Sequence, residues 1–165
     1  MAKYDKAGCL KWLDDNGYKY EKLEHEAVFT MEEMDAAGIT KQGNVVKNLF
    51  VRNAKGDKHY LVSAHEDRKS DMNKLAILLG STKLSFASPK RMDKYLGVKQ
   101  GSVSPLCVLN DENHEVMVAF DQSLMGDERI GVHPLENTAT IFMSFKDLKK
   151  IIEDQGNKFK CIKLE

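Results

Sequence analysis

The chain has no long apolar run, since none of its apolar stretches approaches the roughly 18 residues that a membrane-spanning helix requires. The first residues, Met1 to Lys6, also lack the apolar core of a signal peptide and lead directly into a helical pattern. These absences favour a cytoplasmic protein with no membrane association.

An excess of charge is also missing, because 25 basic and 25 acidic residues give a net charge of zero. A protein that grips long stretches of nucleic acid usually carries a basic excess. Bulk binding of nucleic acid through overall charge is therefore excluded. The clusters Arg68-Lys69 and Lys90-Arg91 with Lys94 are either a local patch for a few phosphates or ordinary solvated surface.

The usual signatures of metal and nucleophile chemistry are absent. The three cysteines, Cys9, Cys107 and Cys161, are far apart and show no CxxC or CxxH spacing, which argues against a zinc site or a redox motif. The chain contains no GxSxG, P-loop, GxGxxG or HExxH sequence. We therefore expect no metal and no cofactor, and nothing supports a nucleophilic triad or nucleotide-dependent chemistry.

The 165 residues suffice for one domain with a buried core, and no repeat or linker divides them. Start and stop signals predict five helices, for which caps such as Asp71 and Ser88 and terminal glycines such as Gly80 set the limits. The predicted helices cover residues 7–15, 30–37, 71–79, 88–97 and 144–155.

Alternating and apolar runs predict the strands. One hairpin is expected from 44–52 and 58–63, and a second from 106–109 and 115–120. The remaining predicted strands cover 18–23, 139–143 and 158–163. We therefore predict a single α/β (α+β) domain, residues 1–165, with a mixed, largely antiparallel sheet and helices packed outside it.

Lys47 interrupts the apolar strand Val45 to Val51. Strict alternation places Lys47 on the face of Val45 and Leu49, and Asn48 on the opposite face. The lysine is either an edge-strand residue that prevents aggregation or an ammonium directed into a pocket, where it would orient a phosphate or a carbonyl oxygen.

The segment Gly101-Ser-Val-Ser-Pro105 is a predicted loop. Glycine permits backbone conformations that expose N–H groups, and Pro105 fixes the direction in which the chain leaves the loop. The loop either presents amides to a developing oxyanion or is only a connection.

His133 lies between Val132 and Pro134, immediately before the strand 139–143. A histidine held by a strand is a candidate for chemistry, although a lone histidine is also commonly a satisfied structural residue. The other histidines are dispersed without metal-ligand spacing, and His25 alone could border a cleft.

Taken together, these segments resemble the YbaK/prolyl-tRNA-synthetase-associated editing domains, and most of all the PrdX-like branch of alanyl-tRNA(Pro) deacylases. The resemblance covers most of the chain, and its motifs are specific in this order and spacing. One departure is Glu26-Ala27, where relatives often carry prolines. The segments that carry the resemblance are Val28-Phe29-Thr30, Lys47-Asn48-Leu49-Phe50, Lys83 to Ser88, Gly101 to Pro105, and Gly131-Val-His133-Pro134 with Asn137 to Thr140.

The resemblance implies a YbaK-like fold and a role for each matching residue. Lys47 would hold the terminal phosphate or the aminoacyl end, the Gly101 amides would flank the scissile carbonyl, and His133 would orient the substrate or the attacking water. The remaining matching residues would bind substrate: Phe29, Thr30, Asn48, Ser102, Pro105, Pro134 and Asn137.

The activity implied by the resemblance is hydrolysis of the ester that joins a wrong amino acid to the tRNA 3′ adenosine. Its partners would be the acceptor end of tRNA(Pro) and prolyl-tRNA synthetase, and its substrate would be Ala-tRNA(Pro). Two alternatives stay open: a deacylase for Cys-tRNA(Pro), and a regulatory module that binds aminoacyl-tRNA without hydrolysing it. The sequence does not decide the acyl preference, the tRNA identity elements, the oligomeric state or which residue positions the water.

Overall fold

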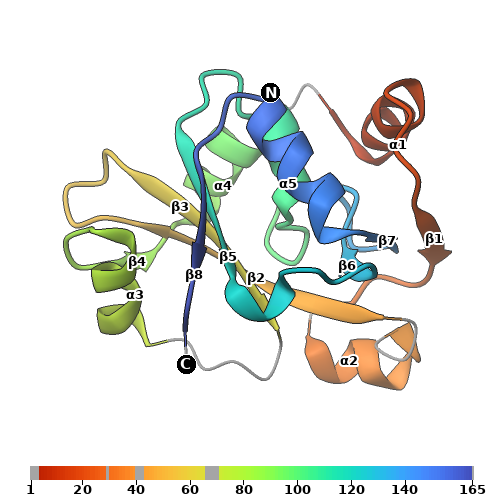
Figure 1. The fold of residues 1–165 in the computed structure, drawn as a ribbon, viewed down its shortest axis with the longest axis horizontal. Coiled ribbons are helices and arrows are strands. Elements are labelled where there is room, and N and C mark those ends of the chain that lie inside the picture. Colours follow the sequence, from red (N-terminus) through yellow and green to blue (C-terminus); the bar gives the residue numbers. More distant parts are fainter. Residues whose placement is uncertain (1–3, 29, 40–42, 66–70, 165) are drawn as a thin grey trace.

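The computed structural model describes residues 4–28, 30–39, 43–65 and 71–164. Eight strands form one sheet in the order β1-β7-β6-β2-β3-β5-β8, and β4 pairs with β2 (Figure 1). The elements are α1 (Lys6–Asp15), β1 (Glu21–Glu24), α2 (Met31–Ala36), β2 (Asn44–Arg52), β3 (His59–His65), α3 (Met72–Leu79), β4 (Ser85–Phe86), α4 (Pro89–Leu96), η2 (Pro105–Asn110), β5 (Val116–Asp121), η3 (Gln122–Leu124), β6 (Ile130–Val132), β7 (Ala139–Met143), α5 (Phe145–Asp154) and β8 (Phe159–Ile162).

The sheet is mixed, as the sequence predicted. The pairs β1–β7, β6–β7, β2–β3 and β2–β4 are antiparallel, whereas β2–β6, β3–β5 and β5–β8 are parallel. The predicted α/β class with a mixed, largely antiparallel sheet is therefore confirmed. No helix in the described ranges is both long enough and apolar enough to span a membrane.

Helices cover both faces of the sheet, and the alternation of β2 decides which side chains each face buries. Phe50 packs with Leu96 of α4 and Ile151 of α5 in the larger core. Val51 packs with Leu75 of α3 on the opposite face. Figure 1 shows α4 and α5 on one side of β2 and β3, and α2 and α3 on the other. The side chains of β2 therefore face two different cores.

The predicted helix starts are confirmed by their capping hydrogen bonds. The side chains of Thr30, Asp71, Ser88 and Ser144 each accept a backbone N–H from the first turn of the helix that follows. Gly80 then ends α3 in the left-handed conformation, with φ of 67°. These local interactions satisfy amides and carbonyls that a helix end leaves unpaired.

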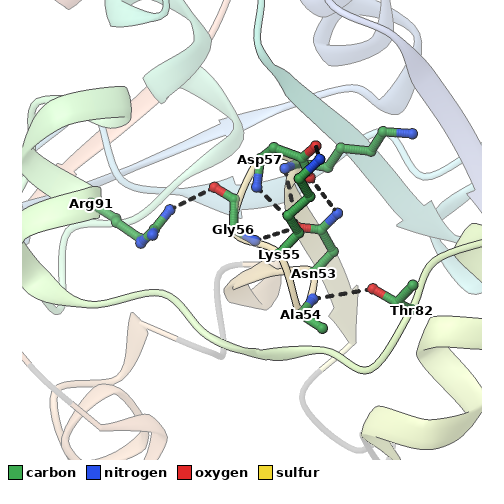
Figure 2. Close-up of polar contacts among 8 residues, drawn as sticks. Asn53, Ala54, Lys55, Gly56, Asp57, Thr82 and Arg91 are labelled. Carbon is green, nitrogen blue, oxygen red and sulfur yellow. Dashed lines mark hydrogen bonds and ion pairs between the residues drawn. The ribbon is translucent and has the colours of Figure 1, made fainter.

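The turn of the first hairpin is organised by one side chain and docked on α4 (Figure 2). Asn53 Oδ1 accepts the backbone amides of residues 56, 57 and 58, at 2.8–3.2 Å. Arg91 of α4 donates to the Gly56 carbonyl at 2.9 Å, and the Ala54 amide donates to Thr82 at 3.1 Å. Gly56 is required here, because its φ is 79° and a Cβ atom would lie 2.9 Å from the Arg91 guanidinium.

His59 fixes α4 against the sheet from the buried side. Its Nε2 lies 2.9 Å from Arg91 Nη1, and its ring lies between those of Phe50 and Tyr95, at centroid distances of 5.5 and 4.1 Å. Burial, and then the positive charge of Arg91, lower the pKa of His59 to about 4. His59 is therefore neutral at pH 7 and accepts the hydrogen bond from Arg91.

The second predicted hairpin is wrong. The apolar run Leu106–Leu109 belongs to η2, a 3-10 helix whose N-cap is Ser104, and not to a strand. The following strand, β5, pairs in parallel with β3 and β8. The short strands β4 and β6 were not predicted. The strand expected at 18–23 begins further along the sequence, as β1 (Glu21–Glu24).

Candidate active site

The two edges of β2 are paired to very different extents. β3 pairs with nearly the whole of one edge. On the other edge, β6 pairs with Asn44 and Val45 at the start, and β4 pairs with Val51 and Arg52 at the end. Within the described part of the chain, no strand pairs with this edge at residues 46–49. We call the resulting gap between β6 and β4 the β2 slot.

A cavity of about 290 Å³ opens at the β2 slot. It brings together five residues that the sequence singled out, Thr30, Lys47, Asn48, Gly101 and His133, although they come from four separate segments. The cavity is lined by Val28, Thr30, Met34, Val46, Lys47, Asn48, Leu49, Phe50, Phe86, Met92, Gln100, Gly101, Val103 and His133.

His133 follows β6 directly and lies at the β6 end of the slot. Its Nδ1 is 2.9 Å from the carbonyl oxygen of Ala139, which can only accept a hydrogen bond. The neutral ring therefore carries its proton on Nδ1, and Nε2 keeps its lone pair for a partner in the cavity. Burial lowers the pKa of His133, outweighing the hydrogen bond to Ala139 that raises it. The neutral form predominates at pH 7.

His25 lies behind His133 and outside the cavity lining. The two rings meet edge to face with centroids 6.3 Å apart. His25 Nδ1 donates to the Glu26 carbonyl at 2.7 Å, and Nε2 is 2.9 Å from the hydroxyl of the buried Thr140. The proximity of His25 contributes a further lowering of the pKa of His133.

Asn48 presents its carboxamide from the middle of β2. The buried Ser63 lies directly opposite on β3 and donates its hydroxyl to Asn48 Oδ1 at 2.6 Å. This bond leaves the Asn48 NH₂ group as the donor toward the cavity. The backbone of Asn48 also faces the slot, because Phe50, two residues further along, directs its carbonyl to the Ala87 amide on the same edge.

The Gly101 loop forms the wall opposite β2. Gly101 has φ of 92°, a conformation that suits glycine. The Ser102 amide already donates to the Lys99 carbonyl at 3.1 Å. Gly101 and Val103 line the cavity, whereas Ser102 does not. Gly101 and Val103 are therefore the residues of this loop segment that reach the cavity, and the amide of Ser102 between them is already engaged.

The other predicted substrate-binding residues have different places. Thr30 lines the cavity and caps α2. Asn137 is buried, and its Nδ2 donates to the Val28 carbonyl at 2.9 Å, which holds the Val28 segment against the loop after β6. Ser102, Pro105 and Pro134 are buried outside the cavity lining. Phe29, like the Arg68-Lys69 cluster, lies outside the described residues.

Several lining residues were not singled out from the sequence. Met34 and Val28 pack together beneath the β6 end of the slot, whereas Met92 and Phe86 lie at the β4 end. Isolated methionines and phenylalanines carry no sequence signal that separates a pocket wall from a core. Only the β2 pairings, which are tertiary contacts, bring these residues to the slot. Among the described residues, no three His, Cys, Asp or Glu side chains gather as a metal site requires.

A family model described as the aminoacyl-tRNA editing domain matches residues 25–151. That range contains all of β2, the Gly101 loop and His133. The chain belongs to the aminoacyl-tRNA editing domain family. The family expected from the sequence motifs is therefore confirmed.

Relatives of this editing-domain family match nearly the full chain. The protein is 48% identical to the prolyl-tRNA editing protein ProX of Acetoanaerobium sticklandii, over 96% of this chain and 97% of the relative. It is 34% identical to the prolyl-tRNA synthetase associated domain-containing protein 1 of Bos taurus, over 83% and 82% of the two chains. A solved structure of a proposed trans-editing enzyme for prolyl-tRNA synthetase shares the fold, with a TM-score of 0.69 at 22% identity over 97% and 98% of the chains.

Proposed function

We propose that this protein is a trans-editing deacylase that hydrolyses the aminoacyl ester of mischarged tRNA(Pro), with Ala-tRNA(Pro) as its substrate. Residues 1–165 act as one editing domain in the cytoplasm, which binds the acceptor end of tRNA(Pro) and works beside prolyl-tRNA synthetase. The observation that carries the proposal is the meeting of Lys47, Asn48, Gly101 and His133 in the β2 slot. The ProX relative, 48% identical, supports it.

The chemistry begins with water held at His133. The lone pair on Nε2 accepts a proton from this water as its oxygen attacks the ester carbonyl carbon. A tetrahedral intermediate forms, and its bond to the ribose oxygen then breaks as Nε2 of His133 passes the proton to that oxygen and becomes neutral again. The products are the free amino acid and the tRNA with its terminal hydroxyl restored.

Donors across the slot stabilise the negative charge that develops on the carbonyl oxygen. The Asn48 carboxamide, oriented by Ser63, lies on one side, and the amides of Gly101 and Val103 lie on the other. Fixed donors of this kind need little reorganisation during the reaction, and the loss of one typically lowers kcat by about 10²–10³-fold. An ester is already activated, so positioning and electrostatics suffice.

A deacylation time course with Ala-, Cys- and Pro-tRNA(Pro) tests the proposed function. We expect rapid loss of alanine and sparing of the prolyl ester. Preferential loss of cysteine would identify a cysteinyl-tRNA(Pro) deacylase instead. If no ester is cleaved faster than in buffer, the domain is a binding module and the proposal is wrong.

Met34 is expected to set the size limit of the acyl pocket, because it is buried against Val28 at the β6 end of the slot. Met34→Ala removes several heavy atoms from that wall and makes room for the larger prolyl group. We expect kcat/KM for Pro-tRNA(Pro), relative to Ala-tRNA(Pro), to rise about 10- to 100-fold, the range that a few methylene groups contribute to discrimination. Met34→Leu conserves volume and is the matched control. An unchanged ratio would remove Met34 from the sieve.

Ser63 is expected to act through Asn48. Ser63→Ala removes the hydroxyl that orients the carboxamide, and we expect kcat to fall about 10-fold with little change in the free energy of unfolding. A double-mutant cycle provides the control, because Ser63→Ala should have no further effect once Asn48 is alanine. Additive effects of the two substitutions would show that Ser63 acts independently of Asn48.

A further inference from the structure

Phe86 is an exposed aromatic side chain at the β4 end of the slot. It is 64% exposed, whereas Phe50, which lines the same cavity, is 2% exposed. Among the described residues, the other large hydrophobic side chains with such exposure are Ile77 and Met125, and neither lines the cavity. An apolar ring held in water at the mouth of a pocket is a feature of recognition surfaces.

The backbone fixes Phe86 in this exposed position. Phe86 pairs with Val51 of β2, and the next residue, Ala87, donates its amide to the Phe50 carbonyl at 2.9 Å. Leu84 and Ala87, on either side of the two-residue strand, are buried. The ring therefore projects outward because its neighbours anchor the segment to the core.

The pairing of β4 with β2 places Phe86 on the same face of the sheet as Lys47. Directly opposite residues share a face of the sheet, and so do residues two apart, so Phe86, Val51 and Lys47 lie on one face. Val51 lies four residues beyond Lys47, about 13 Å along the strand. The terminal nucleotides of a single strand span such a distance.

We propose that Phe86 is a stacking platform for an unpaired base at the 3′ end of the tRNA. The inference rests on the proposed function for the identity of its ligand. The acyl group then lies at the His133 and Met34 end of the slot, and the chain of nucleotides leaves it across the Phe86 end. Stacking on an aromatic face is the usual way in which proteins hold single-stranded bases.

Steady-state deacylation of Ala-tRNA(Pro) separates this role from the alternatives. We expect Phe86→Ala to raise KM about 10-fold with kcat unchanged, because the base is held equally in the ground and transition states. Phe86→Tyr should restore KM, whereas Phe86→Leu, which keeps apolar bulk without a π face, should not. An unchanged KM, or a fall in kcat with a changed acyl preference, would overturn the proposal.

A binding measurement keeps the test independent of hydrolysis. Trp12 is the single tryptophan of the chain, so Trp12→Phe combined with Phe86→Trp places one fluorophore at the platform. The trinucleotide CCA carries no acyl group, and we expect it to quench this fluorescence with saturation. Quenching without any wild-type deacylation would uphold the platform while refuting the deacylase. Absence of quenching up to millimolar trinucleotide would overturn the platform itself.

Discussion

Replacing His133 by alanine is expected to lower kcat for Ala-tRNA(Pro) about 100- to 1000-fold, with KM changed little. The proposed mechanism assigns to Nε2 of His133 the proton of the attacking water, because His133 lines the cavity and its Nδ1 is engaged with the Ala139 carbonyl. General bases contribute about 10²–10⁴-fold. Single-turnover deacylation at saturating enzyme measures the chemical step directly. Unchanged deacylation would remove His133 from the mechanism.

The control for this substitution is His133→Asn, which can still donate a hydrogen bond to the Ala139 carbonyl but has no basic nitrogen. It should preserve the melting temperature and lose activity as the alanine variant does. A variant that keeps both activity and fold would show that His133 is only structural, as lone histidines often are.

The pH dependence of the wild type follows from the same geometry. Protonation of His133 removes the lone pair on Nε2, so the rate falls as the pH drops through the pKa of the folded protein. Burial holds that pKa below the ordinary value of about 6.5. The rate should therefore stay level from about pH 8 to 6.5 and decline only at more acid pH.

Replacing Lys47 by methionine is expected to raise KM about 10- to 100-fold. Lys47 lines the cavity, and the substitution keeps its unbranched apolar stem but removes its ammonium. Contact with one phosphate of a single strand also predicts that the slope of log affinity against log salt weakens by about 0.7. Titration of the protein with tRNA(Pro) that carries no amino acid, at several salt concentrations, gives this slope.

Lys47→Arg is the matched variant, because it preserves positive charge in a different shape. It should keep the salt dependence and lose part of the affinity. If Lys47→Met binds tRNA(Pro) more weakly but the slope of log affinity against log salt is unchanged, the ammonium contacts the aminoacyl end rather than a phosphate. Unchanged KM and kcat would leave Lys47 as an edge-strand lysine, an interpretation that the incompletely paired edge of β2 also permits.

Helix ends were predictable because their causes are local. Thr30, Asp71, Ser88 and Ser144 each accept amides within a few residues, so the sequence contains the whole interaction. The hairpin of β2 and β3 was predictable for the same reason, because Asn53 organises its turn with amides close in the sequence.

The wrong second hairpin reflects the limit of periodicity. All of Leu106 to Leu109 is buried, and a short apolar run has the same pattern in a strand and in a buried helical turn. The available signal was Ser104-Pro105, a cap followed by a first-turn proline, like the pair Ser88-Pro89 that begins α4. The parallel pairing of β5 with β3 depends on distant segments and left no local trace.

The candidate site was only half predictable. Lys47, Asn48, Gly101 and His133 stand out because polar residues and glycine interrupt apolar or extended segments. Ser63 could not be found in this way, since a serine in a strand is commonplace until the register places it opposite Asn48. Leu135 illustrates the same limit, because this buried residue of the loop after His133 has φ of 67°, which its residue type does not suggest.

The most direct test of the account is the methionine methyl spectrum of the protein, labelled with carbon-13, during titration with a non-hydrolysable amide analogue of 3′-alanyl-adenosine. Met34 and Met92 lie at opposite ends of the β2 slot, whereas Met125 is exposed elsewhere and Met143 is buried in β7. We expect the Met34 and Met92 signals to shift together and to saturate, while those of Met125 and Met143 stay in place. Saturable binding that leaves Met34 and Met92 unchanged would place the ligand outside the slot and contradict the account.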